Sequence, residues 1–159
     1  MSAVTYTLRR EQWIARPIDE VFAFFADAHN LEKITPPWLG FKILSMSTDS
    51  IEKGTMIRYR LRLHGIPVHW QTEICEWNPP HYFVDEQIKG PYKLWRHMHW
   101  FEAYGNRTKG IDEVQYSLPF GVLGRIVHAV KVRGDVIRIF DYRRQQIEAR
   151  FGQPGENSA

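Results

Sequence analysis

The hydrophobic pattern of the chain is most regular toward its C-terminal end. Between residues 120 and 151, apolar side chains recur every three or four residues and so share one side of a helix. A helix of roughly 30 residues is about 45 Å long and needs a large apolar surface to cover such a stripe. Gly134 lies inside the pattern, either where the helix crosses a strand or where it leaves room for a ligand. The stripe consists of Leu123, Ile126, Val127, Val130, Ile137, Phe140, Ile147 and Phe151.

The preceding chain is a series of short segments in which apolar and polar residues alternate, as they do in half-buried β-strands. Strands are predicted over 4–15, 41–46, 55–64, 68–74, 81–89, 93–104 and 108–118. One short helix begins at Pro17, and a second covers 31–34, before Thr35-Pro36-Pro37. Trp38, in the loop that follows, either caps the core or gates a cavity. Because most turns between strands are short, we expect antiparallel pairing.

These elements predict an α+β protein. A curved antiparallel sheet of six to seven strands wraps around a long C-terminal helix, and two short helices follow strand 1. A length of 159 residues suits one domain with its own core. We place that domain at 1–151 and expect a disordered tail at 152–159.

Composition narrows the possible partners. The formal charge of +3 and the pI near 9.1 are too small to indicate nucleic-acid binding. No apolar run is long enough for stable membrane insertion, and the start of the chain has no signal-peptide pattern. A single cysteine, Cys75, excludes an internal disulfide framework and favours a reducing, cytoplasmic location. We predict no cofactor, and a protein partner stays possible.

Residues 55–64 show the clearest alternation. Ile57, Tyr59, Leu61 and Leu63 share one face of the strand, and Arg58, Arg60 and Arg62 share the other. The arginine face is either a solvated outer face or a surface for an acidic partner or phosphates.

The most informative stretch for chemistry is 95–101, Trp-Arg-His-Met-His-Trp-Phe. His97 and His99 leave the same face of one strand, roughly 6.5 Å apart along it. If this face points inward, Asp85 and Gln87 on a neighbouring strand can hydrogen-bond to the two imidazoles. A register shift of one residue would turn all of these groups outward.

Four interpretations of this stretch stay open: a satisfied polar patch, a ligand pocket with polar anchors, a metal site, and acid–base catalysis. A His-x-His pair can bind one metal ion, but sequence spacing places no third ligand, so no metal is predicted. In catalysis, His97 or His99 would act as the base, oriented by Asp85 or Asp112. The chain has no glycine-rich phosphate loop, no nucleophile elbow and no paired CxxC pattern.

Several motifs resemble the START-like, or SRPBCC, superfamily of helix-grip proteins, in particular its bacterial branch related to polyketide cyclases and lipid-transport proteins. The resemblance covers residues 4–151 and implies a deep cavity between the sheet and the C-terminal helix. Such cavities usually hold lipids, sterols, polyketides or quinones. The resemblance carries no catalytic residue to this chain. The motifs are Trp13-Ile14-Ala15-Arg16-Pro17-Ile18-Asp19-Glu20-Val21-Phe22, Asn30-Leu31 with Thr35-Pro36-Pro37-Trp38, Gly90-Pro91-Tyr92, Trp95-x-His97-x-His99-x-Phe101, 112–116 and Leu118-Pro119-Phe120-Gly121.

Our first hypothesis is therefore a cytoplasmic protein that binds a hydrophobic small molecule with a polar end, such as a lipid, polyketide or quinone. Transport of that molecule is an open extension of this hypothesis. The second is a cyclase- or hydrolase-like enzyme that uses His97 or His99 as general base. The third is a regulator that contacts a protein through the arginine face. In the first hypothesis the apolar lining is Tyr59, Leu61, Trp70 and Trp95, and the polar anchors are Asp85, Gln87, His97, His99 and Tyr116.

Overall fold

The computed structural model describes residues 3–152 and contains seven strands, all paired antiparallel in the order β1-β7-β6-β5-β4-β3-β2. The expected order of elements is confirmed, including the two short helices after the first strand. The strands are β1 Tyr6–Ile14, β2 Lys42–Met46, β3 Met56–Leu63, β4 Ile66–Asn78, β5 Tyr82–Lys89, β6 Leu94–Tyr104 and β7 Arg107–Ser117. The helices are α1 Ile18–Phe25, α2 Ala28–Ile34, the 3₁₀ turn η1 Pro37–Leu39, α3 Gly121–Val127, the π-helical turn η2 His128–Val132 and α4 Arg133–Phe151. Apart from Gly152, the predicted tail lies outside the described residues.

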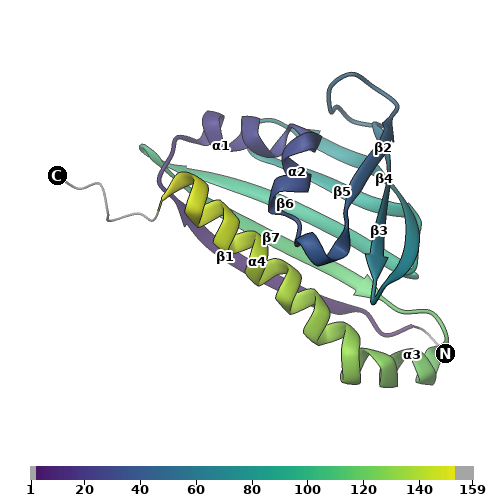
Figure 1. Ribbon diagram of the computed structural model, residues 1–159. Coiled ribbons are helices and arrows are strands. Elements are labelled where there is room, and N and C mark those ends of the chain that lie inside the picture. Colours follow the sequence, from purple (N-terminus) through teal and green to yellow (C-terminus); the bar gives the residue numbers. More distant parts are fainter. Residues whose placement is uncertain (1–2, 153–159) are drawn as a thin grey trace.

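The sheet curves around the C-terminal helix, and α1 and α2 lie on the same face of it (Figure 1). Ring contacts fix this arrangement on β6. Phe140 of α4 packs edge-on against His97, and Phe22 of α1 packs edge-on against Phe101. Helices on one face of the sheet therefore enclose a space above the centre of β6.

The alternation of β3 is realised as expected. Ile57, Tyr59 and Leu61 are buried, and the arginines between them are exposed on the outer face. Each such side chain contributes about 1.5–3 kcal/mol when it is fully removed from water. The apolar face of β3 therefore fixes which side of the sheet lines the interior.

The C-terminal helical segment runs from Gly121 to Phe151, as the pattern predicts, but half of its predicted stripe faces solvent. Phe140, Ile147 and Phe151 are buried on α4. In contrast, Leu123, Ile126, Val127 and Val130 are 45–81% exposed. Figure 1 shows α3 projecting past the end of the sheet. Val130 lies on η2, which packs on β1 and β7 through His128 and leaves Val130 exposed to solvent.

The residues that α3 and η2 do turn toward the protein include Gly124 and His128. His128 hydrogen-bonds to the hydroxyl of Tyr116 at 2.8 Å and stacks on Tyr6 with ring centroids 3.4 Å apart. The buried residues Gly124 and His128 are four positions apart, slightly more than one turn of an α-helix. The π turn contains an extra residue, so it keeps residues with this spacing on one side of the helical segment.

Gly134 has neither of the two roles considered from the sequence. A Cβ atom at this position would meet nothing within 4 Å, so it marks neither a close crossing with a strand nor space kept for a ligand. It is an exposed residue of the first turn of α4.

Candidate functional site

A cavity of about 170 Å³ lies between the sheet and the helices α1, α2 and α4. Its walls are mostly apolar, with Phe24, Leu31 and Ile34 on the helical side. The four residues expected to form the apolar lining all belong to it: Tyr59, Leu61, Trp70 and Trp95.

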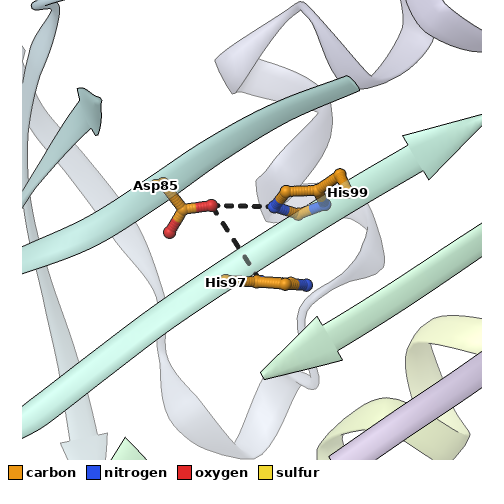
Figure 2. A group of neighbouring side chains, drawn as sticks. All are labelled: Asp85, His97 and His99. Atoms are coloured by element: carbon orange, nitrogen blue, oxygen red, sulfur yellow. Dashed lines mark hydrogen bonds and ion pairs between the residues drawn. The ribbon is translucent and has the colours of Figure 1, made fainter. Parts of the chain in front are cut away.

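One part of the cavity wall is charged and consists of Asp85, His97, His99 and Arg143. Together with Asp112, which contacts both histidines but does not line the cavity, these residues form what we call the histidine cluster. His99 donates a hydrogen bond from Nε2 to Oδ2 of Asp85 at 2.7 Å (Figure 2). His97 donates from Nε2 to Oδ1 of Asp112 at 2.8 Å. A carboxylate is only an acceptor, so these contacts place a proton on Nε2 of each ring. Both histidines are buried, 6% and 4% exposed, as the inward-facing register requires.

Strand pairing explains why these groups meet. In the β5–β6 ladder Asp85 lies opposite His97, and in the β6–β7 ladder Asp112 lies opposite His99. The hydrogen bonds run diagonally: His99 bonds to Asp85, which lies opposite His97, and His97 bonds to Asp112, which lies opposite His99. Diagonal neighbours are within reach of long side chains on one face of an antiparallel sheet.

Arg143 completes the histidine cluster from α4, and the sequence analysis did not identify it. Its Nε lies 3.4 Å from Oδ2 of Asp112, and its Nη2 lies 3.3 Å from Nδ1 of His99. The side chain is buried, and its guanidinium carbon is 5.3 Å from the centroid of Phe25. A signal was present: Arg143 follows Phe140 by three residues and precedes Ile147 by four, which places it on the buried stripe.

Burial and neighbouring charges act against each other on the two carboxyl groups. Burial disfavours both charged forms. The hydrogen bond from His99, with the charges of the histidines and Arg143, nevertheless lowers the pKa of Asp85. The charge of Arg143, with hydrogen bonds from both histidines, holds the pKa of Asp112 well below its usual range.

The pKa values of the two imidazoles are shifted in opposite directions. Burial, reinforced by the charge of His99, lowers the pKa of His97 to about 4. Burial also acts against the charge on His99, but contacts to Asp112 and Asp85 outweigh it and raise the pKa of His99. A neutral imidazole therefore lies beside one that retains its proton more readily.

Two of the expected polar anchors lie away from the cavity lining. Gln87 donates to the carbonyl oxygen of Tyr92 at 2.7 Å and accepts from the Tyr92 amide at 3.2 Å, closing the turn between β5 and β6. Tyr116 is buried against α4 and bonds to His128. Asp85, His97 and His99 are the expected anchors that the structure brings together.

A match to a known family accompanies this geometry. Residues 14–138 match the family model described as polyketide cyclase / dehydrase and lipid transport. The chain belongs to this family. Its fold is the helix-grip fold of the START-like superfamily, as the resemblance implied. No curated protein matches the chain by sequence.

Solved structures of similar fold come from plants and bacteria. Norcoclaurine synthase from Thalictrum flavum is 14% identical, with 94% of this chain and 98% of that chain covered and a TM-score of 0.69. Major latex-like protein 151 from Panax ginseng is 15% identical, with coverages of 92% and 97% and a TM-score of 0.67. An aromatase/cyclase from Streptomyces sp. R1128 is 14% identical, with coverages of 98% and 100% and a TM-score of 0.66. At these identities the similarity shows the fold alone.

In the part of the chain that the structure describes, no helix combines the length and the apolar character needed to cross a membrane.

Proposed function

We propose that the protein binds a compact amphipathic molecule in the cavity, with the polar end of the molecule against the histidine cluster. The observation that carries the proposal is an apolar cavity with buried charges in one part of its wall. Ligand sites in proteins combine apolar walls with a few convergent polar groups in this way. Membership of the family supports binding of a hydrophobic ligand in general. Transport of the ligand and a cytoplasmic location stay predictions.

Unpaired donors indicate the chemistry of the polar end. Within residues 3–152, the buried Nε1 of Trp70 has no hydrogen-bond partner, and the buried Nε of Arg143 makes no hydrogen bond although it lies 3.4 Å from Oδ2 of Asp112; both residues line the cavity. Buried donors in folded proteins almost always have an acceptor. We therefore expect the ligand to present acceptor oxygens, as a carboxylate, a carbonyl or a phenolate does.

The volume limits the ligand. A cavity of roughly 150 Å³ accommodates a benzene molecule, and this one measures about 170 Å³. One ring or a short chain fits inside, and the rest of a larger ligand would extend out of the cavity. This size favours an aromatic or polyketide-like molecule or a quinone ring over a lipid with two chains.

The test is a titration of the protein with toluene, phenol and benzoate, which share one ring and differ in their polar end. Trp70 and Trp95 line the cavity, so their fluorescence reports binding. We expect benzoate and phenol to bind more tightly than toluene. Leu61→Phe, which adds bulk to the cavity wall, should weaken all three, and Ile66→Phe at the exposed start of β4 should weaken none. Equal affinity of the Leu61→Phe variant and the wild type would refute the cavity as the site.

A second candidate is an enzyme of the cyclase or hydrolase type, favoured by the opposite pKa shifts of His97 and His99. Groups whose environments separate their pKa values are candidates for acid and base in one reaction. His97, with its neutral ring, would accept a proton, and His99 would donate one. Loss of turnover in His97→Ala with ligand binding retained would support catalysis. Retained turnover in both single histidine variants would exclude it.

A further inference from the structure

Three side chains of the histidine cluster converge on one point. Oδ2 of Asp85 lies 2.7 Å from Nε2 of His99 and 4.0 Å from Nδ1 of His97. The three ligand atoms all lie within 4.8 Å of one another, and Figure 2 shows the carboxylate facing both rings. Ligands held about 2.1 Å from a tetrahedral Zn²⁺ ion lie about 3.4 Å apart. The two observed distances bracket that value, so small side-chain rotations would bring the atoms to coordinating positions.

The contacts on the opposite side of each ring are those of metal-binding histidines. A histidine that binds a metal through one nitrogen usually directs the other toward a carboxylate, which fixes the ring. Here Nε2 of His97 and Nδ1 of His99 both face Oδ1 of Asp112, at 2.8 and 3.2 Å. Arg143 holds that carboxylate in turn, 3.4 Å from its Oδ2. One acid thus orients both imidazoles, and Nδ1 of His97 and Nε2 of His99 are directed toward Asp85. Metal binding requires Nε2 of His99 to release its proton, and the ring then keeps a proton on Nδ1, which faces Asp112.

We propose that Asp85, His97 and His99 bind one divalent first-row transition ion, with Zn²⁺ as the probe. Two imidazoles and one carboxylate suit such an ion, and three protein ligands leave a coordination position open. All three ligands line the cavity. The open position would therefore receive an acceptor oxygen of the amphipathic ligand, so this part of the inference rests on the proposed function. Sequence spacing does not reveal the third ligand because Asp85 lies on a different strand from the histidine pair.

The experiment is a calorimetric titration of metal-stripped, ligand-free protein with ZnCl₂, repeated with Co²⁺ and followed by visible absorption. We expect one ion per chain and a Co²⁺ spectrum of nitrogen and oxygen coordination. His97→Ala, His99→Ala and Asp85→Asn should each reduce affinity by at least about 100-fold. Asp112→Asn should reduce it by about 10–100-fold, because Asp112 only positions the ligands. The control is His64→Ala, which removes an exposed histidine paired with Asp135 at 2.7 Å.

Absence of Zn²⁺ binding by the wild type, or equal affinity in the His97→Ala and His99→Ala variants, would show that the histidine cluster is only a hydrogen-bonded network. Far-ultraviolet circular dichroism of each variant in EDTA checks that it is folded. If a variant does not fold, the wild-type protein still tests the proposal. A Zn²⁺-dependent rise in its melting temperature and the Co²⁺ spectrum show whether it binds the metal. The titration contains no organic ligand, and the ring-compound titrations can be run in EDTA. Failure of the metal site and failure of the ligand site are therefore distinguishable.

A second inference rests on a separate surface, the α3 patch, formed by exposed apolar residues at the N-terminal part of the C-terminal helical segment. Phe120, Leu123 and Val130 are 79%, 62% and 81% exposed. Contiguous exposed apolar surface on a protein marks a site of interaction. Figure 1 shows α3 projecting beyond the sheet, and the exposure of these side chains leaves them free to meet a flat surface. The other members of the patch are Val122, Ile126 and Val127.

Charge identifies the partner of the α3 patch. Arg125, Lys131 and Arg133 lie in this segment, and no acidic residue occurs between Glu113 and Asp135. A second copy of the chain would bring like charges together, whereas anionic lipid headgroups complement them. We infer that the α3 patch docks reversibly on an anionic membrane surface.

Co-sedimentation with vesicles tests this inference, using phosphatidylcholine alone and phosphatidylcholine with phosphatidylserine. We expect binding to the anionic vesicles only, weakened by salt and abolished by Leu123→Glu or Val130→Glu. Ile66→Glu is the matched control, since Ile66 is 67% exposed at the start of β4. Anionic-vesicle binding that Leu123→Glu and Ile66→Glu affect equally would overturn the inference. Self-association that Leu123→Glu abolishes, without vesicle binding, would assign the patch to a second copy and also overturn it.

Discussion

Arg143→Met tests whether the histidine cluster is held together by its buried guanidinium. Met keeps most of the length of the side chain and removes the charge beside Asp112. Removing one partner of a buried ion pair costs about 3–5 kcal/mol, because the other charge is left without compensation. His97 and His99 still donate to Asp112, so we expect the lower end, about 3 kcal/mol. For a chain of this size, that loss lowers the melting temperature by about 6–12 °C.

Urea denaturation followed by circular dichroism at pH 7 measures the effect. An unchanged dependence on urea concentration would show that the variant unfolds as the wild type does. The neighbouring substitution Arg144→Met is the control. Arg144 is exposed and pairs with Glu148 at 3.1 Å, one turn along the helix. Such a surface pair contributes only about 0.3–0.5 kcal/mol.

The double variant Arg143→Met/Asp112→Asn should be less destabilised than the sum of its single variants, since it leaves no buried charge unpaired. Coupling of about 0.5–3 kcal/mol is typical of contacting residues in one network. A loss below 1 kcal/mol in Arg143→Met, or strict additivity in the double variant, would contradict the view that Arg143 stabilises the cluster.

Four further predictions concern the C-terminal helical segment and Trp38, whose ring contacts it. Gly134→Ala should raise stability in thermal unfolding by about 0.5–1 kcal/mol, since its Cβ meets nothing and alanine favours the helix. Gly124→Ala should lower stability, because its Cβ would clash with the backbone oxygen of Pro119; equal effects of the two substitutions would contradict this difference. Burial and the charge of a nearby arginine lower the folded-state pKa of His128, so its neutral form contributes stability above pH 6.5 that falls as the pH falls below that value. His128→Gln should flatten this part of the stability–pH curve, and an unchanged curve would exclude the effect. The ring of Trp38 contacts α4, and we expect it to slow the exchange of ligand between the cavity and solvent. Stopped-flow measurements on Trp38→Ala should therefore show faster release of benzoate, and an unchanged rate would contradict a gating role of Trp38.

Much of the fold could be predicted because sheet alternation and burial coincide. Side chains in a strand alternate between the two faces of the sheet, so assigning one residue to the inside assigns all the others. The burial of alternate residues in β3 and the inward direction of His97 and His99 could therefore be predicted. The meeting of His99 with Asp85 follows from pairing of adjacent strands.

The errors arise where local pattern does not determine the environment. Leu123 and Ile126 continue the helical stripe on α3, but the sheet ends before them, and no sequence period reveals where a partner surface stops. Gln87 shares a face with Asp85, yet a nearby turn offers two backbone groups to its amide. Arg143 was overlooked because a charged residue is seldom buried unless it is paired, and its partner Asp112 lies on a distant strand.

The most direct test of the central claim is native mass spectrometry of the protein purified from its own host, followed by extraction and identification of the released molecule. We predict one small amphipathic molecule per chain, with acceptor oxygens at one end, and its absence from the Leu61→Phe variant. A protein that carries no such molecule, and that also binds no member of a panel of ring acids, phenols, quinones and lipids, would contradict the proposed ligand site.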